Sequence, residues 1–540
     1  MLLANRLYFS RLPADTIVLV VGMACERVVS DRTMNRRDFL FSSAALALAS
    51  STRLGADSLP HHLPESARRR TPYIEEIPVP EYHNAPQSAY EAFRDMKFGV
   101  RIHWGIYSIW HRGRESWPFL NMPFSDRQEY NQLYKTWNPS GFNADQWMDL
   151  FHESGMKMFA FTSKHHEGFS MFDTKTRVRQ RANWTAPGGP AIESCDIAYS
   201  IMETPFRRDV VKELCDAAQK REIKIDLYFS HPDWYDADFR PYVYHPLQVP
   251  SSLQLTSAQE TDGAKKQLGD SWAVVPDPTP EQAARMMVRH RAQLVELLTN
   301  YGTIDMVCLD MWLGRSLWPE LRKTILQLRQ LQPNVMFRDR GIGNYGDYYT
   351  PERVVPASKE TADAPWFVIY PLGTDFSYEP DAAKHKGTAW IVHNLVDSVA
   401  KGGGFMVGVG PSASGEFHPE AQRQLRGTGV WLKINGEGIY NTRPRDGVLW
   451  SEGDTIRYTR SKDRRWVYAF SQQWPGKELR LTSVKPRAGS VIRLLGYPES
   501  LRWNYDSARG VAVSFPDNLQ DPSHQPCQFA WTLKIETDNG

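Results

Sequence analysis

Side chains that can do chemistry follow five short apolar runs in the middle of the sequence. They are His103 with Trp104, His165 with His166, Tyr228 with His231, Asp310 with Trp312, and Arg338 with Arg340. Imidazoles, aromatic rings and arginines suit the recognition of hydroxyl groups and apolar ring faces, and a carboxylate can serve as nucleophile or proton donor. One such group is often structural, whereas five in succession indicate an active site.

A metal centre is one interpretation of these residues. Its ligands would come from His103, His165, His166, Glu167 and His231. The sequence has no HExxH motif, and the adjacent side chains of His165 and His166 are expected to point in different directions. We therefore expect no metal and no other cofactor.

A sugar-binding site is the second interpretation. Cleavage of a glycosidic bond needs one carboxylate as nucleophile or base and a second group as acid/base. Asp310 ends the apolar run MVCL and stands close to Trp312, so it is the candidate nucleophile. A helix N-cap or a structural ion pair is the alternative role for this carboxylate.

The elements that would position these residues alternate between strands and helices. Predicted strands cover 98–104, 157–162, 223–229, 304–309, 334–338 and 404–409, and predicted helices cover 143–154, 207–221, 281–300, 318–331 and 384–401. Nearly continuous apolar strands alternating with helices favour a parallel sheet covered on both faces. No GxGxxG motif follows a strand, so we predict a (β/α)8-type (TIM-like) barrel, whose active site lies at the carboxyl ends of the strands.

Beyond residue 435 the pattern changes to alternating apolar and polar residues, as in 455–461, 465–471 and 478–484. This alternation predicts a C-terminal all-β sandwich. The barrel is thus expected over 91–434 and the sandwich over 435–540.

Composition excludes several classes of function. The 540 residues are 41% hydrophobic and 23% charged, typical of a globular protein of more than one domain. A net charge of +2 gives no electrostatic basis for binding nucleic acid. The five cysteines form no CxxC pair, and we expect free thiols.

The N-terminal region resembles a targeting signal. Arg36 and Arg37 precede an apolar run, Phe39 to Ala49, which is too short to span a bilayer and offers small residues for cleavage. We predict a bacterial twin-arginine (Tat) signal peptide over 34–56 and a proline-rich linker over 57–90. Residues 1–33 are then an upstream extension or gene-model error. The mature protein is expected in the periplasm or outside the cell, without a membrane anchor.

Longer motifs point to a known family. MKFGVRIHWGIYS (96–108), FTSKHHEGFSMFDTK (161–175), AKGGGFMVGVGPSASGEFHPE (400–420) and WLKINGEGIYNTRP (431–444) occur in this order. Together they resemble glycoside hydrolase family 29, the α-L-fucosidases, over about two-thirds of the chain. The resemblance implies a retaining enzyme that removes terminal α-L-fucosyl residues from fucosylated glycans, and the predicted signal peptide implies that it is exported.

The resemblance also implies roles for single residues. It makes Asp310 the nucleophile and Glu360 the acid/base, with Glu352 in reserve, because Lys359–Ala362 departs from the family's usual stretch. The predicted sugar-binding residues are His103, Glu115, Trp117, His165, His166, Tyr228, Trp312 and Arg340. Two alternatives remain open: a glycosidase for another sugar, and a carbohydrate-binding protein that has lost catalysis.

Overall fold

The computed structural model describes residues 74–75, 77–242, 245–247, 275–356, 364–447 and 449–538. The predicted signal peptide and upstream extension lie outside these ranges. All described residues belong to one compact unit, Pro60–Gly540. Within the described part of the chain, we find no helix whose length and hydropathy would let it cross a membrane.

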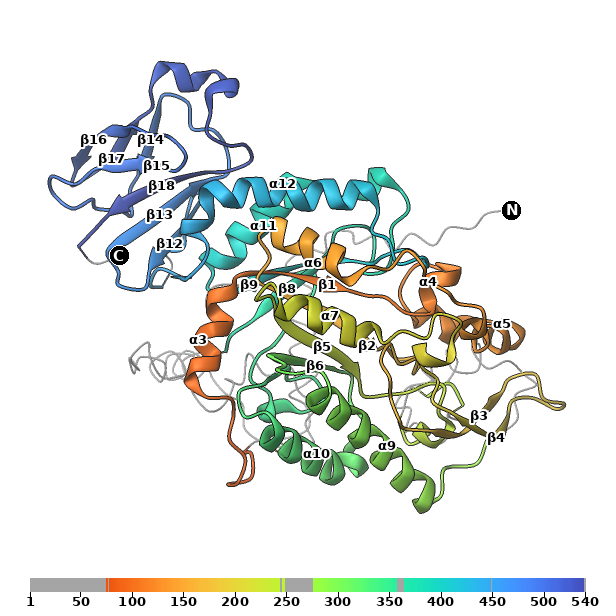
Figure 1. The fold of residues 1–540 in the computed structure, drawn as a ribbon. Coiled ribbons are helices and arrows are strands. Elements are labelled where there is room, and N and C mark those ends of the chain that lie inside the picture. Colours follow the sequence, from red (N-terminus) through yellow and green to blue (C-terminus); the bar gives the residue numbers. More distant parts are fainter. Residues whose placement is uncertain are drawn as a thin grey trace, which may run out of the picture. The chain divides into compact units, whose positions relative to one another are not determined.

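A parallel sheet forms the first part of this unit (Figure 1). Its seven strands are β1 (Phe98–Ile102), β2 (Met158–Lys164), β5 (Lys224–Ser230), β6 (Met306–Asp310), β7 (Met336–Phe337), β8 (Phe367–Pro371) and β9 (Gly404–Val409). They are hydrogen-bonded in the order β7-β6-β5-β2-β1-β9-β8. Nearly all of their residues are buried, which explains why the strands are near-continuous apolar runs.

The segment 348–352 closes this curled sheet between β7 and β8. Single parallel bridges join Tyr348 to Arg338 after β7, and Tyr349 and Glu352 to Trp366 and Ile369 at β8. The predicted TIM-like barrel is therefore confirmed. The sequence-based assignment missed β8, although its residues FVIYP form an apolar run, and it missed 348–352, which contains no such run.

Helices connect the strands, as expected for a barrel. The described α-helices are α3 (Gln87–Met96), α4 (Tyr107–Trp110), α5 (Phe124–Tyr130), α6 (Ala144–Glu153), α7 (Val210–Gln219), α9 (Pro280–Thr299), α10 (Trp318–Leu331), α11 (Thr388–Ala400) and α12 (Pro419–Asn435). Polar side chains cap the start of four of them, including His418 at α12. Asn143 and Asp209 accept hydrogen bonds from the first turns of α6 and α7, and Thr279 forms a capping box with Gln282 in α9.

A β-hairpin, β3 (Val178–Asn183) and β4 (Ala191–Ile197), is inserted after β2. The C-terminal part is an antiparallel sheet domain, in agreement with the predicted all-β fold. Its strands are β10 (Thr442–Arg443), β11 (Ser451–Glu452), β12 (Ile456–Ser461), β13 (Trp466–Ser471), β14 (Glu478–Leu481), β15 (Ile492–Leu494), β16 (Ser500–Asp506), β17 (Gly510–Ser514) and β18 (Trp531–Glu536). Their apolar residues form a second core around Tyr458, Ile492 and Val513.

Charged residues lie inside the barrel, one layer below its carboxyl end. Arg101 on β1 and Arg338 after β7 both donate to the Sγ atom of Cys308, at 3.0 and 3.1 Å. Arg101 also packs 4.5 Å from the ring centre of Tyr228. Cys308 is a free thiol, as are the other three described cysteines. This layer supports the residues at the strand ends from beneath.

Candidate active site

The carboxyl ends of three neighbouring strands bring aromatic and imidazole rings together. His103 follows β1, His165 follows β2, and Tyr228 lies near the end of β5. The ring centres of His103 are 5.8 Å from His165 and 5.9 Å from Tyr228, and His165 stacks on Tyr228 at 5.5 Å. The sequence placed these residues at separate strand ends, and the barrel gathers them at one site.

The adjacent histidines lie side by side, which corrects the expectation that they point apart. Their ring centres are 4.1 Å apart. Strand alternation does not apply here because β2 ends at Lys164 and both histidines lie beyond it.

In both rings the Nδ1 atom is hydrogen-bonded to a serine hydroxyl. His165 Nδ1 is 2.5 Å from Ser116 Oγ, and His166 Nδ1 is 2.7 Å from Ser230 Oγ. Burial lowers the pKa of His165 to about 3 and holds the pKa of His166 and His103 well below its usual value. The three imidazoles are therefore neutral at neutral pH, and in His165 and His166 the Nε2 atom is the nitrogen left for a ligand.

Asp310, the last residue of β6, has both carboxylate oxygens engaged. Tyr228 donates its hydroxyl to Oδ2 at 2.7 Å, while Arg340 Nη1 and the backbone N–H of Met311 each donate to Oδ1 at 3.0 Å. Burial alone would raise the pKa of Asp310, but Arg340 and Arg338 outweigh it and hold the pKa well below its usual range. The side chain is ionised, oriented and only 13% exposed.

One pair of arginines joins Asp310 to Glu352. Arg338 Nη1 is 3.7 Å from Asp310, and its Nη2 donates to Glu352 at 3.3 Å. Arg340 makes an ion pair with each of the two carboxylates. Burial would raise the pKa of Glu352, yet these arginines lower it below its usual value. Glu352 is therefore a charged carboxylate close to Asp310.

Two other predicted sugar-binding residues lie outside the strands: Trp117 begins a short 3-10 helix, and Trp312 lies in a loop. Trp117 packs edge-on against His166, with ring centres 4.8 Å apart. Trp312 is half-buried in the loop after β6, two residues beyond Asp310. Glu360 falls outside the described residues, and its role stays a prediction. Phe376, in the loop after β8, stacks on His103 with ring centres 5.2 Å apart.

Glu115 differs from Asp310 and Glu352, whose pKa values are lowered. It is 8% exposed, and no described residue forms a hydrogen bond with its Oε1 atom. Burial, with the nearby charges of Asp375 and Glu352, raises the pKa of Glu115 to about 7. At neutral pH a large fraction of this side chain carries a proton.

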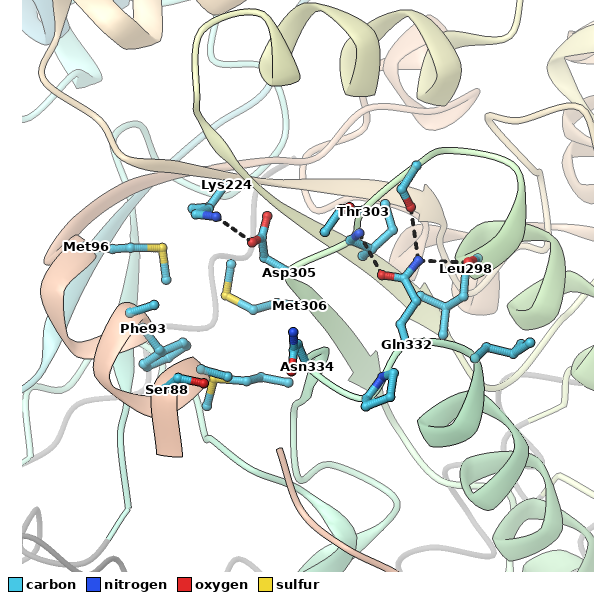
Figure 2. A pocket seen from close by; sticks show the side chains of 17 residues that line it. Ser88, Phe93, Met96, Lys224, Leu298, Thr303, Asp305, Met306, Gln332 and Asn334 are labelled. Atoms are coloured by element: carbon cyan, nitrogen blue, oxygen red, sulfur yellow. Dashed lines mark hydrogen bonds and ion pairs between the residues drawn. The ribbon is translucent and has the colours of Figure 1, made fainter. Parts of the chain in front are cut away.

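No trio of His, Cys, Asp or Glu side chains within the described ranges is arranged to hold a metal ion. A large pocket of about 580 Å³ lies elsewhere, at the amino-terminal ends of β5, β6 and β7. Figure 2 shows two polar features of the pocket wall, the Lys224–Asp305 ion pair and Gln332. The side-chain amide of Gln332 is hydrogen-bonded to backbone groups of neighbouring residues. Because barrel active sites lie at the opposite end, this pocket is separate from the cluster around Asp310.

Two models of known protein families match this chain. A family model described as "Alpha-L-fucosidase" matches residues 76–437. The chain belongs to the α-L-fucosidase family, glycoside hydrolase family 29. A second model, "Alpha-L-fucosidase C-terminal domain", matches residues 451–536 of this family member. It is therefore a glycoside hydrolase with a catalytic barrel and an accessory β domain.

Known α-L-fucosidases resemble it along most of their length. Human tissue α-L-fucosidase is 28% identical over 499 residues, which cover 87% of this chain and 94% of the human protein. Human plasma α-L-fucosidase is 28% identical over 468 residues, covering 82% and 89% of the two chains. Among solved structures, α-L-fucosidase isoenzyme 1 from Paenibacillus thiaminolyticus superimposes with a TM-score of 0.67 at 23% identity, covering 84% and 99%.

Sequence reasoning missed several residues of this fucosidase-family site. Ser116, Ser230 and Arg101 contact the predicted residues from behind. Arg101 offered a signal, because a charged residue inside the buried strand FGVRI must have partners there. The two serines offered none, since single serines at strand ends and in loops are common.

We expect Glu115 to set the alkaline limb of activity. Because its pKa is raised to about 7, the side chain is neutral below that pH and charged above it. If the neutral form is needed, kcat/KM should fall as pH rises through 7, and Glu115→Gln, which cannot ionise, should remove this limb. The pH profile of kcat/KM measures this. An unchanged limb in Glu115→Gln would assign it to another group.

Proposed function

We propose that the protein is a retaining, exo-acting α-L-fucosidase with Asp310 as its nucleophile. Asp310 Oδ attacks the anomeric carbon of a terminal α-L-fucosyl residue. The glycosidic C–O bond breaks as an acid gives its proton to the leaving oxygen. A water molecule, deprotonated by the same group, then cleaves the glycosyl ester and restores the Asp310 carboxylate.

One observation carries this proposal: the Asp310 carboxylate is ionised and held in a fixed orientation at a strand end. Tyr228 and Arg340 bind its two oxygens separately. A nucleophile needs a charged, well-placed oxygen, and groups placed at strand ends are held more firmly than groups in loops. The neutral imidazoles beside it suit hydrogen bonding to sugar hydroxyls.

Structural relatives support the same chemistry. An α-L-fucosidase of Bacteroides thetaiotaomicron, 23% identical with a TM-score of 0.64 over 86% of this chain and 100% of its own, has been described as a trapped covalent intermediate. A covalent intermediate is the feature that separates retaining from inverting glycosidases.

For the acid/base we propose Glu360, following the family resemblance. Glu352 is a poor proton donor in the free enzyme, because the arginines keep it charged. Glu115, whose nearby charges include Glu352, has a pKa raised to about 7, which suits proton transfer at neutral pH. It is the natural second candidate.

A panel of 4-nitrophenyl glycosides tests the activity. We expect rapid hydrolysis of the α-L-fucoside, weak or no hydrolysis of α-D-galactoside and β-D-fucoside, and full activity in the presence of EDTA. Preferred turnover of another glycoside would show a different sugar specificity. Hydrolysis of none, by folded protein, would indicate a carbohydrate-binding protein without catalysis.

We also propose that the enzyme is exported through the twin-arginine route as a bacterial periplasmic or extracellular protein. The support is the arrangement of Arg36 and Arg37 before a short apolar run. A fucosidase acting on glycans outside the cytoplasm would meet its substrate there.

A further inference from the structure

Ser230, the last residue of β5, is fully buried and forms two hydrogen bonds through its hydroxyl. The Oγ atom lies 3.0 Å from the carbonyl oxygen of Pro232 and 2.7 Å from Nδ1 of His166. A carbonyl oxygen can only accept, so the single hydroxyl hydrogen of Ser230 is used on Pro232. Ser230 Oγ must then accept from His166, and the hydrogen of that bond belongs to His166 Nδ1.

The protonation state of the ring follows from its surroundings. Burial, with the nearby Lys164, holds the pKa of His166 well below its usual value, so the imidazole is neutral. A neutral imidazole carries one ring hydrogen. With that hydrogen on Nδ1, the Nε2 atom is bare and can only accept a hydrogen bond.

The opposite arrangement is unfavourable here. With the hydrogen on Nε2, the Ser230 hydroxyl would have to turn toward Nδ1. The Oγ atom and the Pro232 carbonyl would then face each other at 3.0 Å without a hydrogen between them. The ring itself is confined, since Trp117 and Trp234 pack on it with ring centres 4.8 and 5.4 Å away.

We propose that Ser230 is a positioning residue that holds His166 in the Nδ1–H form, so that Nε2 accepts a hydrogen bond from one sugar hydroxyl. The inference rests on the proposed function, in which His166 meets the sugar. At this position the site can only accept, so the sugar hydroxyl must donate the hydrogen bond. Removing that sugar hydroxyl should lower kcat/KM, and removing the Ser230 hydroxyl should make kcat/KM depend less on it.

Nuclear magnetic resonance tests the tautomer without substrate or activity. Long-range 1H–15N spectra of the full chain labelled with 15N-histidine distinguish protonated from bare ring nitrogens, and His166→Gln assigns the signal. We expect Nδ1–H with a bare Nε2 in the unaltered protein and loss of this pattern in Ser230→Ala. A protonated Nε2 in the unaltered protein would overturn the proposal.

Ser163→Ala is the matched control for this spectrum. Ser163 on β2 is also fully buried and donates to a backbone carbonyl, that of Tyr228, at 2.5 Å. Its removal should leave the His166 signals unchanged. Equal changes in both serine variants would mean that any buried hydroxyl lost near these strands disturbs the ring, which contradicts a specific role for Ser230.

Kinetics with the 2-, 3- and 4-monodeoxy analogues of 4-nitrophenyl α-L-fucoside test the consequence. For one position, we expect the unaltered enzyme to lose about 10-fold or more in kcat/KM relative to the parent substrate. In Ser230→Ala this ratio should shrink to about 3-fold or less, and Ser230→Thr, which keeps a hydroxyl, should restore it. Comparing ratios between variants cancels the intrinsic reactivity of each analogue.

The two proposals fail in different ways. If the unaltered enzyme cleaves the parent fucoside but Ser230→Ala keeps the same ratios, the positioning role is wrong and the fucosidase assignment stands. If no fucoside is cleaved, the proposed function is wrong, while the spectrum still reports the tautomer. If Ser230→Ala does not fold, the spectrum of the unaltered protein and the kinetics of Ser230→Thr still test the positioning role.

Discussion

Asp310→Gly should lose roughly 10⁴-fold or more in kcat while the protein stays folded. The change removes the attacking atom itself, whereas a lost binding contact costs far less. Added azide can enter the vacated space and attack from the same face, so an α-fucoside should give β-fucosyl azide. Product stereochemistry, followed by NMR, is the decisive measurement, and circular dichroism reports the fold.

Asp305→Ala is the control for that variant. Asp305 precedes the same strand at its other end, where it pairs with Lys224 at 2.9 Å, far from the reacting groups. We expect kcat to be unchanged and thermal stability to fall, since the variant loses both the ion pair and the hydrogen bond that Asp305 accepts from the backbone N–H of Ile225 at 3.0 Å. A modest loss in Asp310→Gly, without azide rescue, would remove Asp310 from the role of nucleophile.

Glu360→Gly should show the leaving-group dependence of a missing acid/base. With methyl α-L-fucoside, whose leaving group needs a proton, we expect kcat/KM to fall by about 10²–10⁴-fold. With 2-chloro-4-nitrophenyl α-L-fucoside the first step should survive, because this leaving group departs unaided. Azide should then intercept the glycosyl-enzyme and give α-fucosyl azide, with inverted stereochemistry relative to the Asp310→Gly product.

Glu352→Gly and Glu115→Gln belong in the same experiment. Loss of Glu352 leaves Arg338 and Arg340 paired with Asp310 alone, so we expect similar losses with good and poor leaving groups. If Glu352→Gly or Glu115→Gln alone shows the leaving-group dependence and the α-azide, that residue is the acid/base and Glu360 is discarded.

The sequence predicted those elements whose residue pattern is typical of a single kind of structure. A buried apolar strand followed by a polar group predicted β1 with His103 and β6 with Asp310, because barrel geometry places such ends on one face. The apolar run of β8 carried the same signal but was overlooked, whereas 348–352 offered no signal. The latter joins its neighbours through isolated bridges, and a few residues containing Pro351 carry no strand periodicity.

Three-dimensional neighbours were also beyond sequence reasoning. In a strand buried on both faces, polarity does not reveal which residues point into the barrel, so the contact of Arg101 and Arg338 with Cys308 could not be foreseen. The His165–His166 arrangement was predicted wrongly, because the prediction assumed strand alternation and β2 ends at Lys164, before both residues.

The pair of arginines at Asp310 bears on the balance between the two halves of the proposed reaction. While Asp310 is a free carboxylate, Arg338 and Arg340 stabilise its negative charge. Once it becomes a neutral ester, the same cations face a group that no longer attracts them. Esterification is therefore opposed, and departure of the carboxylate from the sugar is assisted. The site gives up some nucleophilicity in exchange for a glycosyl-enzyme that breaks down readily.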